Sequence, residues 1–153
     1  MLNWLFKSPK TRLNHTRRLL ITCQNKQRWG LAQLLLYRIQ NQHGIFLPLK
    51  QMVPLSTEFP HPASIVIGDG VRLGERVKIY QGVTLGGARR GDWQAGNYPV
   101  IGSDVILFAG AVVIGKVTIG NSCIIGANAV VLTDVPDGHT AVGAPARILA
   151  PKS

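Results

Sequence analysis

Hydrophobic residues in the second half of the chain return every six positions. Aliphatic residues stand at 67, 73, 79 and 85 and, after an interruption, at 101, 107, 113, 119, 125 and 131, and most have a small or branched apolar residue four positions later. A helix would need a spacing of 3.6 and a flat strand a spacing of two, whereas six suits short strands separated by tight turns that stack coil upon coil. The pattern therefore predicts a parallel β-helix of hexapeptide repeats.

The repeat is broken once. Leu85 and Ile101 are sixteen residues apart, which is not a multiple of six, so the segment between them is predicted to leave the β-helix as a loop spanning residues 87–99. It is rich in glycine and polar residues and holds Arg89, Arg90 and Trp93. Loops of this length in compact folds are usually functional or disordered, so we expect it to contribute to a site, with a tolerated insertion as the alternative.

The region before the repeats has a different composition. Residues 11–27 and 28–44 are typical of two helices, with Gly44 as a stop signal. No Asp or Glu occurs before Glu58, whereas Lys and Arg occur nine times from Lys7 to Lys50, within a net charge of +10. We therefore expect a basic helical region over residues 1–56 and a β-helix domain over residues 57–150. The charge favours a polyanion or an anionic membrane surface as partner, although such helices often only pack on their own domain. Nucleic acid is not expected, because no recognition motif accompanies the charge.

Cysteine usage and hydropathy bear on the compartment. Cys23 and Cys123 are too few for a disulfide framework, which favours a reducing environment. The apolar stretch before Lys7 is too short for the core of a signal peptide, and no later run reaches about eighteen apolar residues. We expect a cytoplasmic location, with the inner face of the membrane as a variant of it.

Three motifs accompany the repeats: VTLGG at 83–87, VVLTDVPDG at 130–138 and AVGAPAR at 141–147. Together with the six-residue period, they resemble the hexapeptide-repeat acyltransferases, in particular the serine acetyltransferase-like branch that includes polysaccharide O-acetyltransferases. The resemblance implies a left-handed parallel β-helix, a homotrimer with active sites between subunits, and acetyl-CoA as donor. The period alone would equally suit a non-catalytic scaffold that binds a partner.

One histidine matches a motif of that family. The stretch HPASIVIG at 61–68 resembles H-x-x-G-[IV]-V-[IV]-G, with Ser64 in place of the first glycine. By this resemblance His61 is the catalytic residue, and an imidazole suits the task because its pKa lies near neutrality. The alternative is that His61 only caps the first coil. His15, His43 and His139 lack this context and are expected to be structural.

The acceptor is suggested by departures from the family. Serine acetyltransferases have an acid before the histidine and an Arg-His pair where the loop rejoins the repeats, but here Pro60, Asn97 and Tyr98 stand at these positions. Without those charges an amino acid would leave both its charged ends unpaired. We therefore expect a sugar hydroxyl of a cell-surface polysaccharide or its lipid-linked precursor as acceptor, bound by Trp93, Asn97 and Tyr98, with serine as the alternative.

A second departure concerns the partner of the histidine. The family places a carboxylate about fifteen residues upstream, where this chain reads GIFLPLKQ and has no acid. Such a partner fixes the tautomer of the imidazole and stabilises the imidazolium. Glu58, Asp69, Asp92 or a backbone carbonyl could replace it, and the sequence does not choose among them.

The donor site is expected to consist mainly of small residues and backbone groups. By resemblance, the positions along the CoA path are Gly86, Gly87, Ala109, Gly110, Ala127 and Ala129, with Lys116 and Arg147 available for phosphates. No metal is expected. The sequence therefore predicts an acetyl-CoA-dependent O-acetyltransferase.

Overall fold

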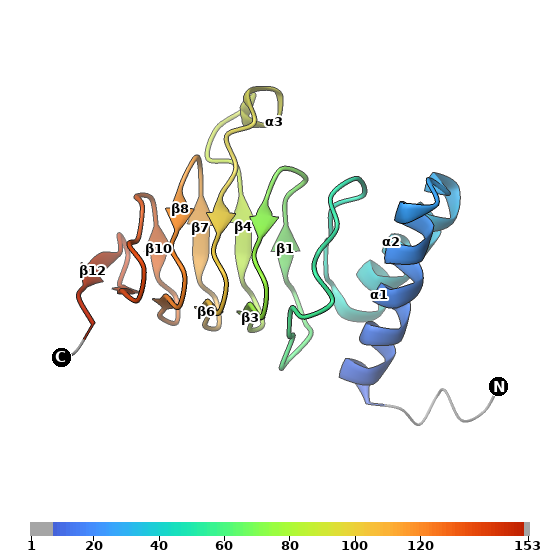
Figure 1. The fold of residues 1–153 in the computed structure, drawn as a ribbon, viewed down its shortest axis with the longest axis horizontal. Coiled ribbons are helices and arrows are strands. Elements are labelled where there is room, and N and C mark those ends of the chain that lie inside the picture. Colours follow the sequence, from blue (N-terminus) through green and yellow to red (C-terminus); the bar gives the residue numbers. More distant parts are fainter. Residues whose placement is uncertain (1–7, 152–153) are drawn as a thin grey trace.

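The structure, a computed structural model, describes residues 8–151; residues 1–7, the start of the predicted basic region, lie outside that range. Two helices, α1 (Pro9–Asn25) and α2 (Trp29–His43), precede a solenoid of short strands (Figure 1). The strands are β1 (Val66–Ile67), β2 (Arg72–Leu73), β3 (Lys78–Ile79), β4 (Thr84–Gly86), β5 (Val100–Ile101), β6 (Ile106–Leu107), β7 (Val112–Ile114), β8 (Thr118–Ile119), β9 (Ile124–Ile125), β10 (Val130–Val131), β11 (Thr140–Val142) and β12 (Arg147–Leu149). A short helix, α3 (Asp92–Ala95), lies between β4 and β5.

The strands form the three faces of a β-helix. The sheets have the orders β1-β4-β7-β10, β2-β5-β8 and β12-β11-β9-β6-β3, and every pair is parallel except β11 with β12. Val66 pairs with Thr84, eighteen residues on, so that three hexapeptides complete one coil. This confirms the predicted left-handed parallel β-helix with a short helical N-terminal region.

The repeating aliphatic residues line the inside of the coils. Ile67, Ile79, Leu85, Leu107 and Ile125 are all buried, and so are the residues four positions further on that fill the corners, such as Val83 and Ala111. Cys123 occupies one of these corner positions and is fully buried and unpaired. Burial of this apolar column is the main force that stabilises the stack.

The break in the repeat is one loop, which leaves the solenoid after β4 and returns to it at β5. Thr84 pairs with Val112, twenty-eight residues on, so the loop adds ten residues to an eighteen-residue coil. The sequence predicted only a loop here, but four of its residues form α3, with Gly91 and Gly96 at its two ends in the left-handed conformation. Figure 1 shows this loop projecting from the solenoid.

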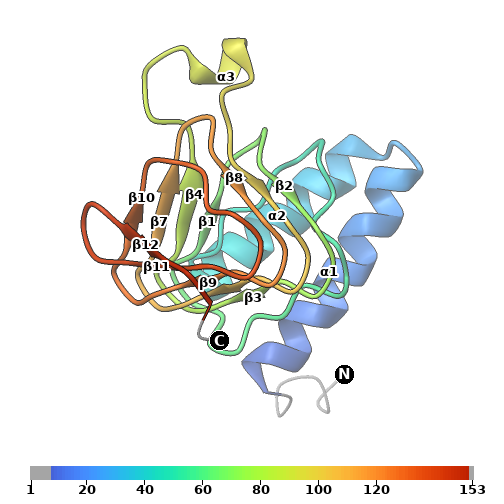
Figure 2. The same ribbon diagram turned by 60° about the vertical axis from the view of Figure 1, so that its left-hand side comes forward.

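Both helices lie at the N-terminal end of the solenoid, as Figures 1 and 2 show. Gly44 ends α2, as the sequence predicted, and has the left-handed conformation. Helix α1 begins at Pro9, two residues before the predicted start, because Ser8 caps it by accepting a hydrogen bond from the Thr11 amide. The Arg17 side chain is buried; it donates to the carbonyl oxygens of Thr57 (2.9 Å) and Pro54 (2.6 Å). Its guanidinium lies over the ring of Phe59 at 4.8 Å, and burial lowers its pKa to about 10. This arginine ties α1 to the segment that leads to His61.

Candidate active site

His61 lies at the corner where the chain enters β1, and its side chain is exposed. The corner continues down the solenoid through hydrogen bonds between successive coils: Gly82 N–H to Ala63 O (3.1 Å), Gly110 N–H to Gln81 O (2.9 Å) and Asn128 N–H to Ala109 O (2.9 Å). We call this column of turns, residues 61–64, 80–83, 108–111 and 126–129, the histidine edge. It presents the exposed imidazole of His61, two aromatic rings, and small residues such as Gly82, Ala109 and Ala127.

Two aromatic rings continue the column below His61. The imidazole centroid lies 6.0 Å from the Tyr80 ring at an interplanar angle of 51°, and Tyr80 stacks on Phe108 at 5.3 Å and 22°. Sequence reasoning missed both rings. The spacing could have identified Tyr80, which follows His61 by nineteen residues, about one coil.

The structure does not supply a carboxylate for His61. Within residues 8–151, its ring contacts Tyr80 and accepts or donates no hydrogen bond with Glu58, Asp69 or Asp92. Position 46, fifteen residues upstream, is held by the half-exposed Phe46. Within the described residues, the ring of Tyr80 is the neighbour that the structure places against the imidazole.

His43 at the end of α2 lies close to the same segment. Burial and the nearby Arg12 lower the pKa of His43, and a hydrogen bond to the carbonyl oxygen of Pro62 opposes this shift. The contact joins the C-terminus of α2 to the residue that follows His61. His43 therefore contacts the segment that carries the candidate site, and its structural role stays a prediction.

The loop of residues 87–99 leaves from a different corner. Asp92 organises it, because its carboxylate accepts hydrogen bonds from the amides of Ala88 (2.6 Å) and Arg89 (2.7 Å) and from the side chain of Asn97 (3.1 Å). These hydrogen bonds, led by that of the Arg89 amide, hold the pKa of Asp92 below its ordinary value. Trp93 at the tip is 70% exposed.

Tyr98 packs where the loop rejoins the solenoid. Its half-buried ring covers Gly68 and Gly70 of the preceding coil, where any Cβ would collide with it. Beside it lies a hollow of about 350 Å³, lined by Arg72, Lys116 and Thr118 among others. We call this corner, residues 68–70, 87–99 and 115–116, the loop edge.

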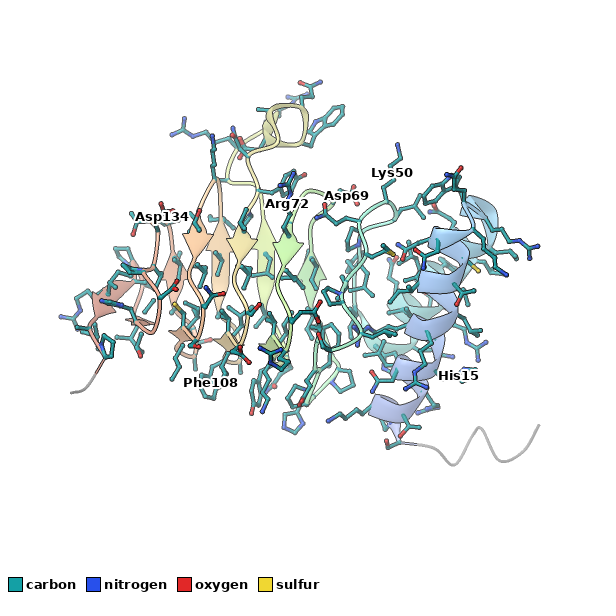
Figure 3. The ribbon with its side chains drawn as sticks, in the orientation of Figure 1. His15, Lys50, Asp69, Arg72, Phe108 and Asp134 are labelled. Carbon is teal, nitrogen blue, oxygen red and sulfur yellow. The ribbon has the colours of Figure 1, made fainter. Side chains whose placement is uncertain are left out.

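The predicted site residues divide between the two edges of one chain. His61, Ala109, Gly110 and Ala127 lie on the histidine edge, with Ala129 buried just inside it, whereas Gly86, Gly87, Trp93, Asn97, Tyr98 and Lys116 lie on or next to the loop edge, and Arg147 lies in β12. Figure 3 shows Phe108 and Arg72 on opposite sides of the solenoid. The sheet β1-β4-β7-β10 lies between the two edges, so one chain alone does not bring His61 to Asn97 and Tyr98. Among the described residues no cluster of three His, Cys, Asp or Glu could hold a metal ion.

Comparison with known proteins gives consistent matches. The family described as bacterial transferase hexapeptide (six repeats) matches residues 98–133. A serine acetyltransferase of Staphylococcus xylosus is 39% identical over 124 residues, which are 81% of this chain and 56% of that protein. The crystal structure of Neisseria gonorrhoeae serine acetyltransferase in complex with serine has a TM-score of 0.78 at 31% identity, over 90% of this chain and 56% of that one. A serine acetyltransferase in complex with CoA has a TM-score of 0.72 at 30% identity, over 95% and 59%.

The two structural similarities each cover at least 90% of this chain. The chain spans about half the length of the curated relatives it matches. In its repeats, motifs and fold the chain is similar to the hexapeptide-repeat transferases and, among them, to the serine acetyltransferases.

Proposed function

We propose that this protein transfers an acetyl group from acetyl-CoA to a hydroxyl group, with His61 as general base. The observation that carries the proposal is the position of His61: an exposed imidazole, in a stretch that matches the family motif, at the head of an edge with small residues. The relatives are serine acetyltransferases, and one related structure is a CoA complex, which supports the same reaction and donor.

The proposed reaction needs one proton acceptor. As the acceptor oxygen attacks the thioester carbonyl carbon, His61 takes the hydroxyl proton; the C–S bond then breaks and the imidazolium returns that proton to the CoA sulfur. The products are an acetyl ester and CoA with a free thiol. In this chain Tyr80 replaces a carboxylate in limiting the orientation of the ring, through packing at 6.0 Å.

We propose that the complete site forms between two copies of the chain. His61 and the loop edge lie on different corners of one solenoid, and a cyclic homotrimer can bring the histidine edge of one copy to the loop edge of the next. The small residues of the histidine edge then leave room for the pantetheine arm, and Lys116 and Arg147 are available for phosphates. We also propose that residues 1–56 form a helical region separate from the catalytic β-helix domain of residues 57–150.

The first acceptor to test is L-serine. The comparisons support this alternative better than the saccharide expected from the sequence, because the named relatives are serine acetyltransferases and one is in complex with serine.

A neutral acceptor is retained as a second candidate for one reason. Asn97 and Tyr98 have uncharged side chains and therefore do not provide the charges that would pair with the ends of an amino acid.

The experiment is a comparison of acceptors. Release of the CoA thiol from acetyl-CoA would be followed with L-serine and with a panel of sugars, and products would be checked by mass spectrometry. A kcat/KM for serine above about 10⁴ M⁻¹s⁻¹ would establish serine, since true substrates usually exceed this value. Sugar turnover with serine inactive would establish the neutral acceptor. Lack of CoA binding and of thiol release with every acceptor would favour a non-catalytic scaffold.

A further inference from the structure

The outer face of α2 carries an apolar stripe that no part of the described chain covers. Leu31, Leu34 and Tyr37 are 50%, 63% and 62% exposed, and their three-residue spacing places them along one side of the helix. The opposite side holds Ala32 and Ile39, which are buried against the rest of the protein. The helix therefore has a second apolar face besides the one that its own packing requires.

Basic residues border this stripe. Arg28 precedes α2 by one residue and lies one turn before Leu31, Arg38 lies one turn after Leu34, and Lys26 is exposed in the turn between the helices. Nine of the seventeen Lys and Arg residues, and none of the seven acids, precede residue 51, so the helical end carries almost all of the net charge of +10. The remaining residues are close to neutral. Seven of the nine basic residues, from Lys10 to Arg38, lie in α1, α2 or the turn between them, so this positive charge is at the end of the protein where Figure 1 shows the two helices.

From these observations we infer that the Leu31–Leu34–Tyr37 stripe of α2 docks on a membrane surface that contains anionic lipids. An amphipathic helix with aliphatic and aromatic residues flanked by Lys and Arg lies in the interface of a bilayer, with its apolar face among the acyl chains and its cations at the headgroups. Within residues 8–151 no helix is long and apolar enough to cross a membrane, and α2 has 15 residues. The contact is therefore peripheral.

A second copy of the chain fits this face less well. If the stripes of two copies packed together, the two basic helical regions would repel each other, because no Asp or Glu occurs before Glu58 to pair with their Lys and Arg residues. The phosphates of a nucleic acid would pair with the basic residues but would not cover the exposed side chains of Leu31 and Leu34. An anionic bilayer satisfies both the charge and the apolar stripe. The inference does not depend on the acceptor or on the acetyl transfer.

Vesicle cosedimentation with the full chain tests this inference. Vesicles of phosphatidylcholine alone would be compared with vesicles that contain about 30% phosphatidylglycerol, at about 0.1 M and 0.5 M salt. We expect binding to the anionic vesicles at low salt, and at least about tenfold weaker binding at high salt or to neutral vesicles.

Leu31→Gln should weaken binding to anionic vesicles by about tenfold, because a leucine no longer enters the acyl region. Leu132→Gln is the matched control: Leu132 is 51% exposed, against 50% for Leu31, but follows β10 in the solenoid, and its replacement should leave binding unchanged. Circular dichroism would show that both variants are folded.

Three results would overturn the inference: no binding to anionic vesicles, equal binding to neutral ones, or equal effects of the two substitutions. A fourth would assign the face differently. In this outcome wild type does not bind vesicles, and Leu31→Gln halves the molar mass measured by light scattering. The stripe would then be covered by a second copy of the chain.

Discussion

Replacement of Gly102 by alanine tests whether the coils stack as closely as the structure shows. Gly102 follows β5, and a Cβ at this position would lie 2.7 Å from the carbonyl carbon of Gly120 and 2.8 Å from the amide nitrogen of Asn121. Ordinary contacts begin near 3.4 Å, so the methyl group would have to push the next coil away. That coil cannot easily yield, because Gly102 N–H donates to Ile119 O and Gly120 N–H to Val135 O, both at 2.8 Å.

Two opposing effects set the change in the free energy of unfolding on Gly102→Ala. Overpacking against fixed neighbours costs about 1–3 kcal/mol. The loss of glycine's freedom in the unfolded chain returns about 0.4–1 kcal/mol where the backbone suits alanine, and Gly102 has no positive φ. We expect Gly102→Ala to lower the free energy of unfolding by about 1–2 kcal/mol, which corresponds to a fall in Tm of roughly 2–8 °C for a chain of this size.

Gly86→Ala is the control. Gly86 also lacks a positive φ, lies in β4, and has no atom within 4 Å of the place that an added methyl group would take. The same substitution there should leave stability unchanged or raise it by up to about 1 kcal/mol. Urea unfolding followed by circular dichroism, at one protein concentration for all variants, would measure both. Equal stability of Gly102→Ala and Gly86→Ala would refute the close stacking.

Further predictions concern the site and its response to pH. Tyr80→Leu should lower kcat by about tenfold or more with little change in acceptor KM, because the imidazole loses the ring that orients it, whereas Tyr80→Phe keeps the ring and should keep the activity; a loss in both variants would instead assign the role to the hydroxyl group. Asp92→Asn removes the negative charge that accepts hydrogen bonds from the loop amides, so a protease should cleave the loop faster and the KM for the acceptor should rise. An unchanged cleavage rate would show that the loop keeps its structure without this charge. His43 has a lowered pKa, so the folded state binds fewer protons than the unfolded state as pH falls below about 6.5 and stability should decrease there. Asp92 also has a lowered pKa, and so does Asp104, whose carboxylate accepts two hydrogen bonds from the Arg76 guanidinium. Both contribute stability that is complete above about 3.8 and lost as pH falls further. Urea midpoints at pH of about 7.5, 5.5, 4 and 2.5 would check this order, because the His43 effect lies between the first three and the Asp effect between the last two. A midpoint that rises on acidification would contradict it.

The fold could be predicted because one interaction repeats. Every coil buries the same kind of side chain at the same position, so residues such as Leu107 and Ile125 report the architecture independently of one another. The helix stop at Gly44 was also predictable, since it depends on the backbone freedom of a single residue.

The site was harder to predict, because it depends on contacts between coils and on side chains that bind their own loop. The ring of Tyr80 reaches His61 only through the pairing of successive coils, which the six-residue period does not specify. Asp92 was one of three acids considered for His61, but it accepts hydrogen bonds from the loop amides instead. Asn97, expected to bind the acceptor, donates to Asp92, and its role in binding stays a prediction.

The central claim, acetyl transfer with His61 as base, is tested most directly by one kinetic comparison. Thiol release from acetyl-CoA would be measured for wild type, His61→Ala and His15→Ala, with serine and with the sugar panel; His15 lies in α1, away from the histidine edge. We predict that His61→Ala loses at least about a hundredfold in kcat/KM, the usual scale for a missing general base, while His15→Ala matches wild type and both remain folded. Activity of His61→Ala within a few-fold of wild type would contradict the account.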